Sequence, residues 1–345
     1  MPAAALSAVC VGETMAVLTP PPGVGLRAAS GLLLGIGGAE SNVAMGLAAM
    51  GLESHWIGRL GNDGFGARIL EELRAHSVGT SGVEVDRLRP TGLYVKVPAL
   101  VYAAGPDGGD AASVLYYRQG SAASAMGPET LDNPEVAALL RGASLIHLSG
   151  ITAALSDGCA ELTRRILSAP REGRVVSFDI NWRPALWRDR DPSVLAALAN
   201  AADVVLVGRD EAELAFGTGD EAELRTLLPD PAVLVVKDAD VRATAWLRDG
   251  SVIRVPALAV EVLEPVGAGD AFAAGYLSGL IFGLDQRACL RRGHISAAAT
   301  LTVHGDRGPL PPAAALAALL ACGDEDWATI RMAAGALTAG GTVRL

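Results

Sequence analysis

Four consecutive residues, Gly267, Ala268, Gly269 and Asp270, place a carboxylate and small residues at the start of an apolar helical run that extends to Phe282. A helix N-terminus presents unpaired backbone N–H groups and the positive end of the helix dipole, which together bind anions such as phosphate. Small residues let the backbone approach such an anion closely. Asp270 is therefore a candidate general base, which accepts the proton of an attacking hydroxyl while the amides hold a phosphoryl group. Alternatively, Asp270 only caps the helix, a position that Asp favours.

A second segment that begins with glycines, residues 37–42 (Gly-Gly-Ala-Glu-Ser-Asn), leads into a predicted helix over 40–50. Gly37 and Gly38 allow a ligand to approach the backbone, and the Asn42 amide can donate to and accept from the hydroxyls of a polyol. A further glycine-rich stretch, 58–66, follows a predicted strand. Taken singly, these stretches are equally explained by a helix start and by an Asp-Gly turn.

These segments lie within a regular alternation of short apolar runs and Ala/Leu-rich stretches. Predicted strands cover residues 8–12, 55–58, 145–148, 175–179, 204–207 and 233–237, and the run 260–263 is a predicted strand that leads into the Gly267 turn. Most are apolar throughout, as in parallel strands that are covered on both faces. Predicted helices occupy residues 40–50, 64–75, 157–167, 192–200 and 268–282. The alternation predicts an α/β fold with a doubly wound, mostly parallel sheet.

Two segments interrupt this alternation. Residues 16–36 contain three consecutive prolines and several glycines, and residues 90–119 are rich in Tyr, Val and Gly. The second segment contains two predicted strands, 93–97 and 114–118, joined by a turn over 103–110. We expect lid segments at about 13–36 and 90–119 to form a small β-sheet inserted into one domain over residues 1–321. Residues 322–345 are left as a tail without an assigned role.

Composition limits the partners. The net charge is −10 and the basic residues are scattered, whereas a nucleic-acid-binding surface needs a basic stripe. No apolar run approaches the ~20 residues of a membrane span, and the N-terminus lacks the basic flank of a signal peptide. The four cysteines lie far apart, which predicts free thiols. We therefore expect a cytoplasmic protein that binds neither nucleic acid nor membrane.

The segments at 37–42, 58–66 and 267–270 resemble, in order and separation, the signature regions of the PfkB (ribokinase-like) carbohydrate kinases, and the resemblance runs from about residue 9 to 311. Stretches at 91–94, 116–124, 147–152 and 179–187 resemble the 2-keto-3-deoxygluconate kinases of that family. The resemblance implies a ribokinase-like fold and ATP-dependent phosphorylation of the primary hydroxyl of a sugar acid, 2-keto-3-deoxygluconate, to its 6-phosphate. Another sugar or a nucleoside as acceptor, or a non-catalytic sugar- or nucleotide-binding role, stays open.

The resemblance also implies which residues form the sugar side of the site. The catalytic residues would be Asp270, Gly267, Ala268 and Gly269, and the sugar-binding residues Gly37, Gly38, Asn42, Tyr94, Tyr116, Arg118, Arg183 and Asp306. Tyr94 and Tyr116 would close over the sugar from the lid. Arg118 and Arg183 would contact its acid end, because a guanidinium binds a carboxylate with two parallel hydrogen bonds. Each arginine is otherwise an ordinary surface residue.

The nucleotide side departs from the family pattern. The resemblance implies that ATP contacts Asn181, Gly208, Lys237, Arg242, Gly267 and Gly269, with Glu211 acting on Mg²⁺ through water. The family's Asn-x-x-Glu motif reads here from Gly208 to Glu211, and both glycines of its Lys-x-Gly-x-x-Gly motif are replaced between Lys237 and Arg242. Glu264 and Pro265 stand where the family favours Asp-Thr, a segment that many members use for a monovalent cation.

The resemblance finally implies the cofactors and partners. ATP and Mg²⁺ are the expected cofactors, and a small sugar acid is the expected substrate. Because lid strands in this family often pair between subunits, we expect a homo-oligomer, either a dimer or a higher assembly.

Overall fold

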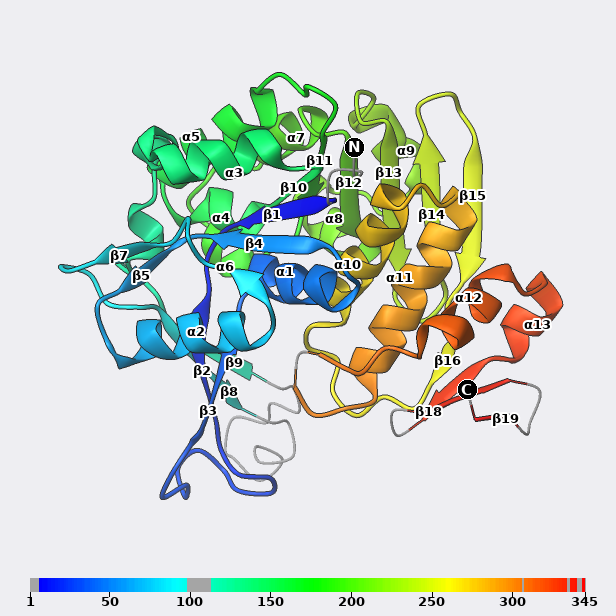
Figure 1. The fold of residues 1–345 in the computed structure, drawn as a ribbon, viewed down its shortest axis with the longest axis horizontal. Coiled ribbons are helices and arrows are strands. Elements are labelled where there is room, and N and C mark those ends of the chain that lie inside the picture. The colour runs from blue at the N-terminus through cyan, green and yellow to red at the C-terminus, as the bar shows by residue number, and fades with distance from the viewer. Residues whose placement is uncertain (1–5, 98–112, 306, 334–335, 340–342, 345) are drawn as a thin grey trace, which may run out of the picture.

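The computed structural model describes residues 6–97, 113–305, 307–333, 336–339 and 343–344. Its centre is a nine-stranded sheet (Figure 1) in the order β15 (Val252–Pro256), β14 (Arg242–Leu247), β13 (Val233–Asp238), β12 (Val204–Gly208), β11 (Val175–Asp179), β10 (Leu145–Ser149), β1 (Ser7–Val11), β4 (Glu53–Ile57) and β6 (Val78–Gly79). The strands from β13 to β6 are parallel, and β14 and β15 add an antiparallel hairpin at one edge. The predicted doubly wound, mostly parallel sheet is confirmed.

Helices cover both faces of this sheet. One face packs against α1 (Ala39–Ala49), α2 (Gly64–Ala75), α10 (Ala268–Ile281) and α11 (Gln286–Leu301). The other face packs against α3 (Pro134–Gly142), α4 (Gly150–Leu155), α5 (Asp157–Ser168), α7 (Ser193–Asn200), α8 (Arg209–Phe216) and α9 (Glu221–Leu227). Along β1, Ala8 and Cys10 belong to one apolar core, and Val9 and Val11 belong to the other. Burial on both faces explains why these strands are apolar throughout.

A second sheet lies below the main one in the view of Figure 1 and forms the predicted lid. Its strands run in the order β3 (Leu33–Gly37), β2 (Met15–Thr19), β8 (Leu93–Val97) and β9 (Ser113–Tyr117). β2 pairs in parallel with β8, and the two outer pairs are antiparallel. Met15, Val17 and Tyr94 form its small buried cluster. The turn predicted over 103–110 lies outside the described residues.

The strand predicted over 260–263 is largely wrong. Only β16 (Ala259–Val260) forms, and it pairs with β17 (Arg331–Ala333) in a separate small sheet that also contains β18 (Ala336–Ala339) and β19 (Val343–Arg344). Val262 and Leu263 are 56% and 53% exposed. Their apolar character misled the prediction, because no neighbouring strand among the described residues is available to pair with them.

The C-terminal segment packs onto the domain. After α12 (Ala313–Ala321), α13 (Asp324–Thr329) buries Trp327, whose indole N–H donates to the Pro256 carbonyl at 2.9 Å. Residues 324–333 thus contribute to the core, although the sequence assigned them no role. The other elements are short: β5 (Arg59–Gly61), β7 (Glu84–Asp86) and α6 (Pro184–Trp187). Within the described ranges, no helix has the length and apolar character needed to cross a membrane.

Candidate active site

The order of the parallel strands determines where a site can form. β1 and β10 are neighbours, yet the chain continues from β1 towards β4 on one side and from β10 towards β11 on the other. Loops diverge at the carboxyl ends of two such strands, which is where ligands of open α/β sheets bind. Glu13 follows β1 by two residues, Ser149 ends β10, and α1 begins beside them. The predicted sugar-side motif at 37–42 therefore lies at the switch point of the sheet.

Asp270 is the third residue of α10. Gly267 is the N-cap and has a φ of 83°, a left-handed conformation that favours glycine. Asp270 is therefore not the cap, and the reading in which it serves only as a cap is wrong. Its Oδ2 accepts a hydrogen bond from Asn42 Nδ2 at 2.9 Å. Asn42 is buried and Asp270 is partly exposed. The structure thus joins the two predicted glycine motifs through one hydrogen bond.

The two helices that carry these residues pack closely along their length. One helical turn beyond the Asn42–Asp270 contact, a Cβ on Gly46 would lie only 2.6 Å from the Cβ of Ala274. At the far end of α1, the Ser278 hydroxyl donates to the Met50 sulfur at 2.9 Å. Residues 42, 46 and 50 thus face residues 270, 274 and 278, each set spaced by four as one helix face requires. Small residues at the crossing bring Asn42 within reach of Asp270.

The lid closes onto the first glycine motif. A Cβ on Gly37 would overlap the Tyr94 hydroxyl, and a Cβ on Gly38 would overlap the Glu13 carbonyl. Tyr94 is 8% exposed, and its ring centroid lies 5.7 Å from that of Tyr116. Of the two predicted lid tyrosines, Tyr94 lies against the predicted sugar motif and Tyr116 packs beside Tyr94.

The glycine-rich stretch 58–66 anchors this lid. Asp63 caps α2 by accepting from the Gly66 N–H at 2.8 Å. Its other oxygen accepts from the Thr91 N–H at 2.8 Å, and the Thr91 hydroxyl donates to Asp63 at 2.9 Å. Thr91 stands two residues before β8, so this cap also determines where the lid strand begins.

Arg118 is already paired with a carboxylate. Its guanidinium donates to Glu13, which also accepts from the Ser121 hydroxyl at 3.0 Å. The side chain of Glu13 is 1% exposed and that of Arg118 is 9% exposed. The guanidinium also lies 5.5 Å from the Tyr116 ring centroid. The sequence reasoning missed Glu13, although its place just after a parallel strand was a usable signal.

Glu40 supports the start of α1. Its side chain is fully buried, and its Oε1 accepts from the hydroxyls of Ser149 and Thr152 at 2.6 Å each. Burial raises the pKa of Glu40, although the two hydroxyl donors act in the opposite direction. The carboxyl group fills the space beside Gly12, where a Cβ would overlap it. Glu40 is a second residue that the sequence reasoning did not single out.

Lys237 stands over the turn that carries Asp270. Its ammonium donates to Asp179 Oδ2 at 3.2 Å and would lie 3.8 Å from a Cβ on Gly269. Burial favours the neutral amine, but the carboxylates of Asp179 and Glu211 outweigh it and raise the pKa of Lys237. The site therefore holds a permanent positive charge beside the helix N-terminus, which suits the binding of phosphate.

Arg183 and Glu211 form an ion pair close to Lys237, on the part of the site that the sequence assigns to the nucleotide. Arg183 Nη1 lies 3.3 Å from Glu211 Oε1, and the Gly208 N–H donates to Glu211 Oε2 at 3.0 Å. Asn181 has a φ of 41°, and its backbone N–H donates to Asp179 Oδ1 at 3.3 Å. Among the contacts of the described residues, none joins Arg183 to Arg118.

One predicted site residue, Arg242, lies in a different cluster. Arg242 donates to Glu221 Oε1 at 3.2 Å, together with Thr244 at 2.9 Å. Arg254 and Trp246 donate to the other Glu221 oxygen at 3.1 Å each. This cluster surrounds the start of α9 and is centred on the Glu221 carboxylate rather than on the turn that carries Asp270. Asp306 lies outside the described residues.

The described residues fit Mg²⁺ bound together with a nucleotide. They contain no group of three or more His, Cys, Asp or Glu side chains that could hold a metal ion. Mg²⁺ usually retains several waters and binds through one or two carboxylates and the phosphates of a substrate. Glu211 is a carboxylate on the Lys237 side, as that arrangement requires.

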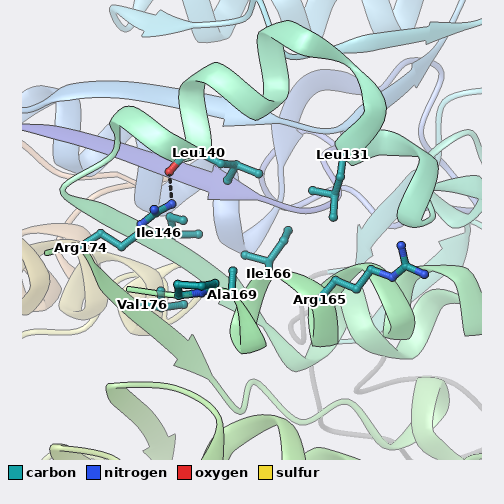
Figure 2. Close-up of a pocket in the computed structure, with 9 residues that line it drawn as sticks. Leu131, Leu140, Ile146, Arg165, Ile166, Ala169, Arg174 and Val176 are labelled. Carbon is teal, nitrogen blue, oxygen red and sulfur yellow. Dashed lines mark hydrogen bonds between the residues drawn. The ribbon is translucent and has the colours of Figure 1, made fainter. Parts of the chain in front are cut away.

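A separate small cavity of about 80 Å³ lies between α3 and α5 (Figure 2). Leu140 and Ile166 line it, and the Arg174 guanidinium donates to the Leu140 carbonyl at 2.7 Å. The cavity shares no residue with the group around Asp270, so it is a local gap in the packing of this face.

Curated relatives resemble the chain over nearly its full length. It is 34% identical to 2-dehydro-3-deoxygluconokinase of Thermoproteus tenax over 316 residues, covering 89% of this chain and 92% of that protein. It is 31% identical to 2-dehydro-3-deoxygalactonokinase of Haloferax volcanii, covering 88% and 93%. It is 28% identical to 5-dehydro-2-deoxygluconokinase of Shouchella clausii, covering 83% and 86%.

Solved structures share the fold. A PfkB protein from Polaromonas sp. JS666 is 32% identical, with a TM-score of 0.73, and the match covers 85% of this chain and 95% of that one. An E. coli protein solved with ATP and Mg²⁺ is 19% identical, with a TM-score of 0.75 and coverage of 88% and 94%. The family model that describes pfkB family carbohydrate kinases matches residues 5–313. The chain belongs to the PfkB family of carbohydrate kinases, which are phosphotransferases.

Proposed function

We propose that this kinase transfers the γ-phosphoryl group of ATP to the primary hydroxyl of 2-keto-3-deoxygluconate, also called 2-dehydro-3-deoxygluconate, giving the 6-phosphate. The observation that carries the proposal is the position of Asp270 in the first turn of α10, oriented by Asn42 and next to the Lys237 ammonium. A base, the backbone amides at a helix N-terminus and a cation thus lie close together, an arrangement that phosphoryl transfer uses.

In the proposed reaction, every proton and bond can be accounted for by ATP, the sugar and the residues around Asp270. The Asp270 carboxylate accepts the proton of the sugar O6 hydroxyl as O6 forms a bond to the γ-phosphorus. The bond from that phosphorus to the β,γ-bridging oxygen breaks, and ADP leaves. The amides of Ala268, Gly269 and Asp270 and the Lys237 ammonium stabilise the charge on the transferring group. Mg²⁺ bound with ATP would supply further charge neutralisation.

Two arginines support an acidic sugar as substrate. Arg118 uses part of its guanidinium for Glu13, and Arg183 uses one nitrogen for Glu211. A guanidinium has five N–H donors, so each retains donors for a substrate carboxylate. The Arg183 side chain is 42% exposed, which leaves it accessible to a ligand. The names of the Thermoproteus and Haloferax relatives agree with a keto-deoxy sugar acid.

A second candidate substrate follows from the same comparisons. The Haloferax relative is named for the galactonate epimer, and the Shouchella relative is named for 5-dehydro-2-deoxygluconate, which carries its keto group at another carbon. The galactonate epimer differs in the orientation of one hydroxyl, whereas 5-dehydro-2-deoxygluconate differs in the positions of both the carbonyl and the deoxy carbon. Arg183 would read the carboxylate of an acidic acceptor, whereas the lid tyrosines and Asn42 would contact the hydroxyls that differ.

A coupled ADP-release assay over a panel of acceptors tests the proposal. The panel holds 2-keto-3-deoxygluconate, its galactonate epimer, 5-keto-2-deoxygluconate, ribose, fructose and adenosine. We expect the highest kcat/KM with 2-keto-3-deoxygluconate. Replacing Arg183 with alanine should raise KM for the keto acid by roughly tenfold, which corresponds to one lost charged hydrogen bond, and should leave KM for a neutral sugar unchanged. A preference for a neutral sugar or a nucleoside, or an unchanged KM in this variant, would exclude an acidic acceptor.

A further inference from the structure

Lys96 is one of only two lysines in the chain. Its side chain extends from the lid to Glu264, in the loop just before the Gly267 turn. It lies on β8 two residues after Tyr94, so both side chains project from the same face of the strand. Tyr94 packs on the Gly37 motif, whereas Lys96 Nζ lies 2.9 Å from Glu264 Oε1. The side chains of Lys96 and Glu264 are 15% and 23% exposed. This ion pair is thus largely shielded and joins residues 168 positions apart.

Glu264 connects this pair to two further segments. It stands three residues before Gly267, the N-cap of the helix that presents Asp270. Its second oxygen accepts from the Gly305 N–H at 3.1 Å, and its backbone N–H donates to the Leu301 carbonyl at the end of α11. One carboxylate therefore contacts the lid, the segment before the catalytic turn and the loop after α11.

We propose that Lys96 and Glu264 are a positioning pair that holds the lid closed against the turn carrying Asp270. Lys96 acts on this turn through its ion pair with Glu264, which stands three residues before the N-cap Gly267. With the pair intact, Tyr94 stays against the sugar motif and water is kept away from the base. With the pair broken, the lid opens more readily, the sugar binds less tightly, and water can take the place of the sugar hydroxyl.

The physical setting favours this role over an ordinary surface ion pair. Exposed ion pairs contribute little because water and salt screen them. Here both groups are shielded, and hydrogen bonds from Lys96 and the Gly305 N–H outweigh burial and lower the pKa of Glu264. The carboxylate therefore stays charged throughout the neutral range.

The experiment compares three variants and one control. Lys96→Met removes the charge and keeps the length of the side chain, whereas Lys96→Arg keeps the charge. Glu264→Gln removes the charge and keeps an oxygen for the Gly305 N–H. Arg171→Gln serves as the control, because it breaks another partly buried ion pair, the one between Arg171 and Asp203. That pair lies at the amino ends of the parallel strands, whereas the candidate site lies at their carboxyl ends. Hydrogen exchange over 93–97 and 261–267 is measured without any sugar, together with ADP release with and without acceptor.

For Lys96→Met and Glu264→Gln we expect faster exchange in both segments and increased ADP release without acceptor. The acceptor KM should rise by about tenfold and kcat should change much less. Lys96→Arg should resemble the wild type, and Arg171→Gln should show none of these effects. Wild-type exchange and wild-type ADP release without acceptor in either charge-removing variant would overturn the proposal, as would the same changes in Arg171→Gln.

The expected change in acceptor KM rests on the proposed function. The hydrogen-exchange measurement and the measurement of ADP release without acceptor do not. If the wild type accepts no sugar acid, the proposed function fails while hydrogen exchange still decides the role of the pair. If Lys96→Met does not fold, Glu264→Gln carries the same test.

Discussion

Asp270 has a defined environment on the side that faces α1. Its Oδ2 accepts a hydrogen bond from Asn42 Nδ2 at 2.9 Å, which fixes the orientation of the carboxylate. The sequence predicts that Asn42 contacts the sugar, and the structure adds that its amide orients the proposed base, Asp270. This second role explains why an amide is suited to the position, because a neutral donor fixes the carboxylate without pairing it with a charge.

Replacing Asp270 with asparagine tests the base directly. The amide preserves the shape but cannot accept the proton, so kcat should fall by roughly 10²–10⁴-fold. Binding of the sugar, measured by calorimetry, should change little. Asp157→Asn is the matched control, since Asp157 also lies in the first turn of a helix, α5, and is fully exposed. A near-normal kcat in Asp270→Asn would show that another group takes the proton.

At the N-terminus of α10, Gly267 and Gly269 are glycine for two different physical reasons. Gly267 has a φ of 83°, whereas Gly269 lies within the first helical turn, where a Cβ would meet the Lys237 ammonium at 3.8 Å and no other described residue within 4 Å. The first glycine is needed for the shape of the backbone. The second leaves open the space in which a phosphoryl group would lie.

Alanine at each position should separate these purposes. Gly267→Ala forces a side chain into the left-handed region and should lower the free energy of unfolding by roughly 1–2 kcal/mol. Gly269→Ala should leave that free energy unchanged or slightly higher, because alanine favours helices, but should lower kcat/KM by narrowing the phosphate space. Urea denaturation and the ADP-release assay measure the two quantities. Equal losses of stability in both variants would contradict the assignment.

Two buried histidines make the stability of the whole molecule depend on pH. Burial, with a smaller effect of Lys237, lowers the pKa of His147 to about 3, and burial lowers the pKa of His294 to about 4. In the unfolded chain an imidazole takes up a proton near pH 6.5. Between about pH 6.5 and 4 the unfolded state thus binds more protons, and the free energy of unfolding falls as the pH falls.

A His147→Asn variant isolates this effect. Each such histidine contributes at most about 1.4 kcal/mol per pH unit, so the variant should show a shallower loss of stability on acidification. The comparison is made between variant and wild type at pH 7.5, 6.0 and 5.0 by urea denaturation. Glu40 acts in the opposite direction, since its raised pKa stabilises the fold at low pH, but it is common to both proteins and cancels. Parallel curves would show that His147 takes up its proton in the folded protein.

The assembly of the molecule stays a prediction from the resemblance. The outer strands of the lid expose apolar side chains, among them Leu33 at 59% and Tyr117 at 62%. Such a surface is compatible with pairing between two lids.

Much of this protein follows from local patterns in the chain. The parallel strands are apolar because both of their faces are buried, and the helix starting near Gly267 follows from a glycine turn before an apolar run. The four lid strands lie in the two segments that interrupt the alternation. The run 260–263 shows the limit of such patterns, because an apolar stretch becomes a strand only where a partner strand is available.

The partners of the functional side chains were decided by the tertiary structure alone. Asn42 meets Asp270 across 228 residues, and Arg118 meets Glu13 across 105. Lys96 meets Glu264 across 168. The sequence by itself determined which residues could hold a sugar and a phosphoryl group, since residue type and glycine turns are local properties. Only the order of the strands and the close crossing of α1 and α10 decided which side chains meet, because ion pairs and hydrogen bonds depend on distances that no local pattern specifies.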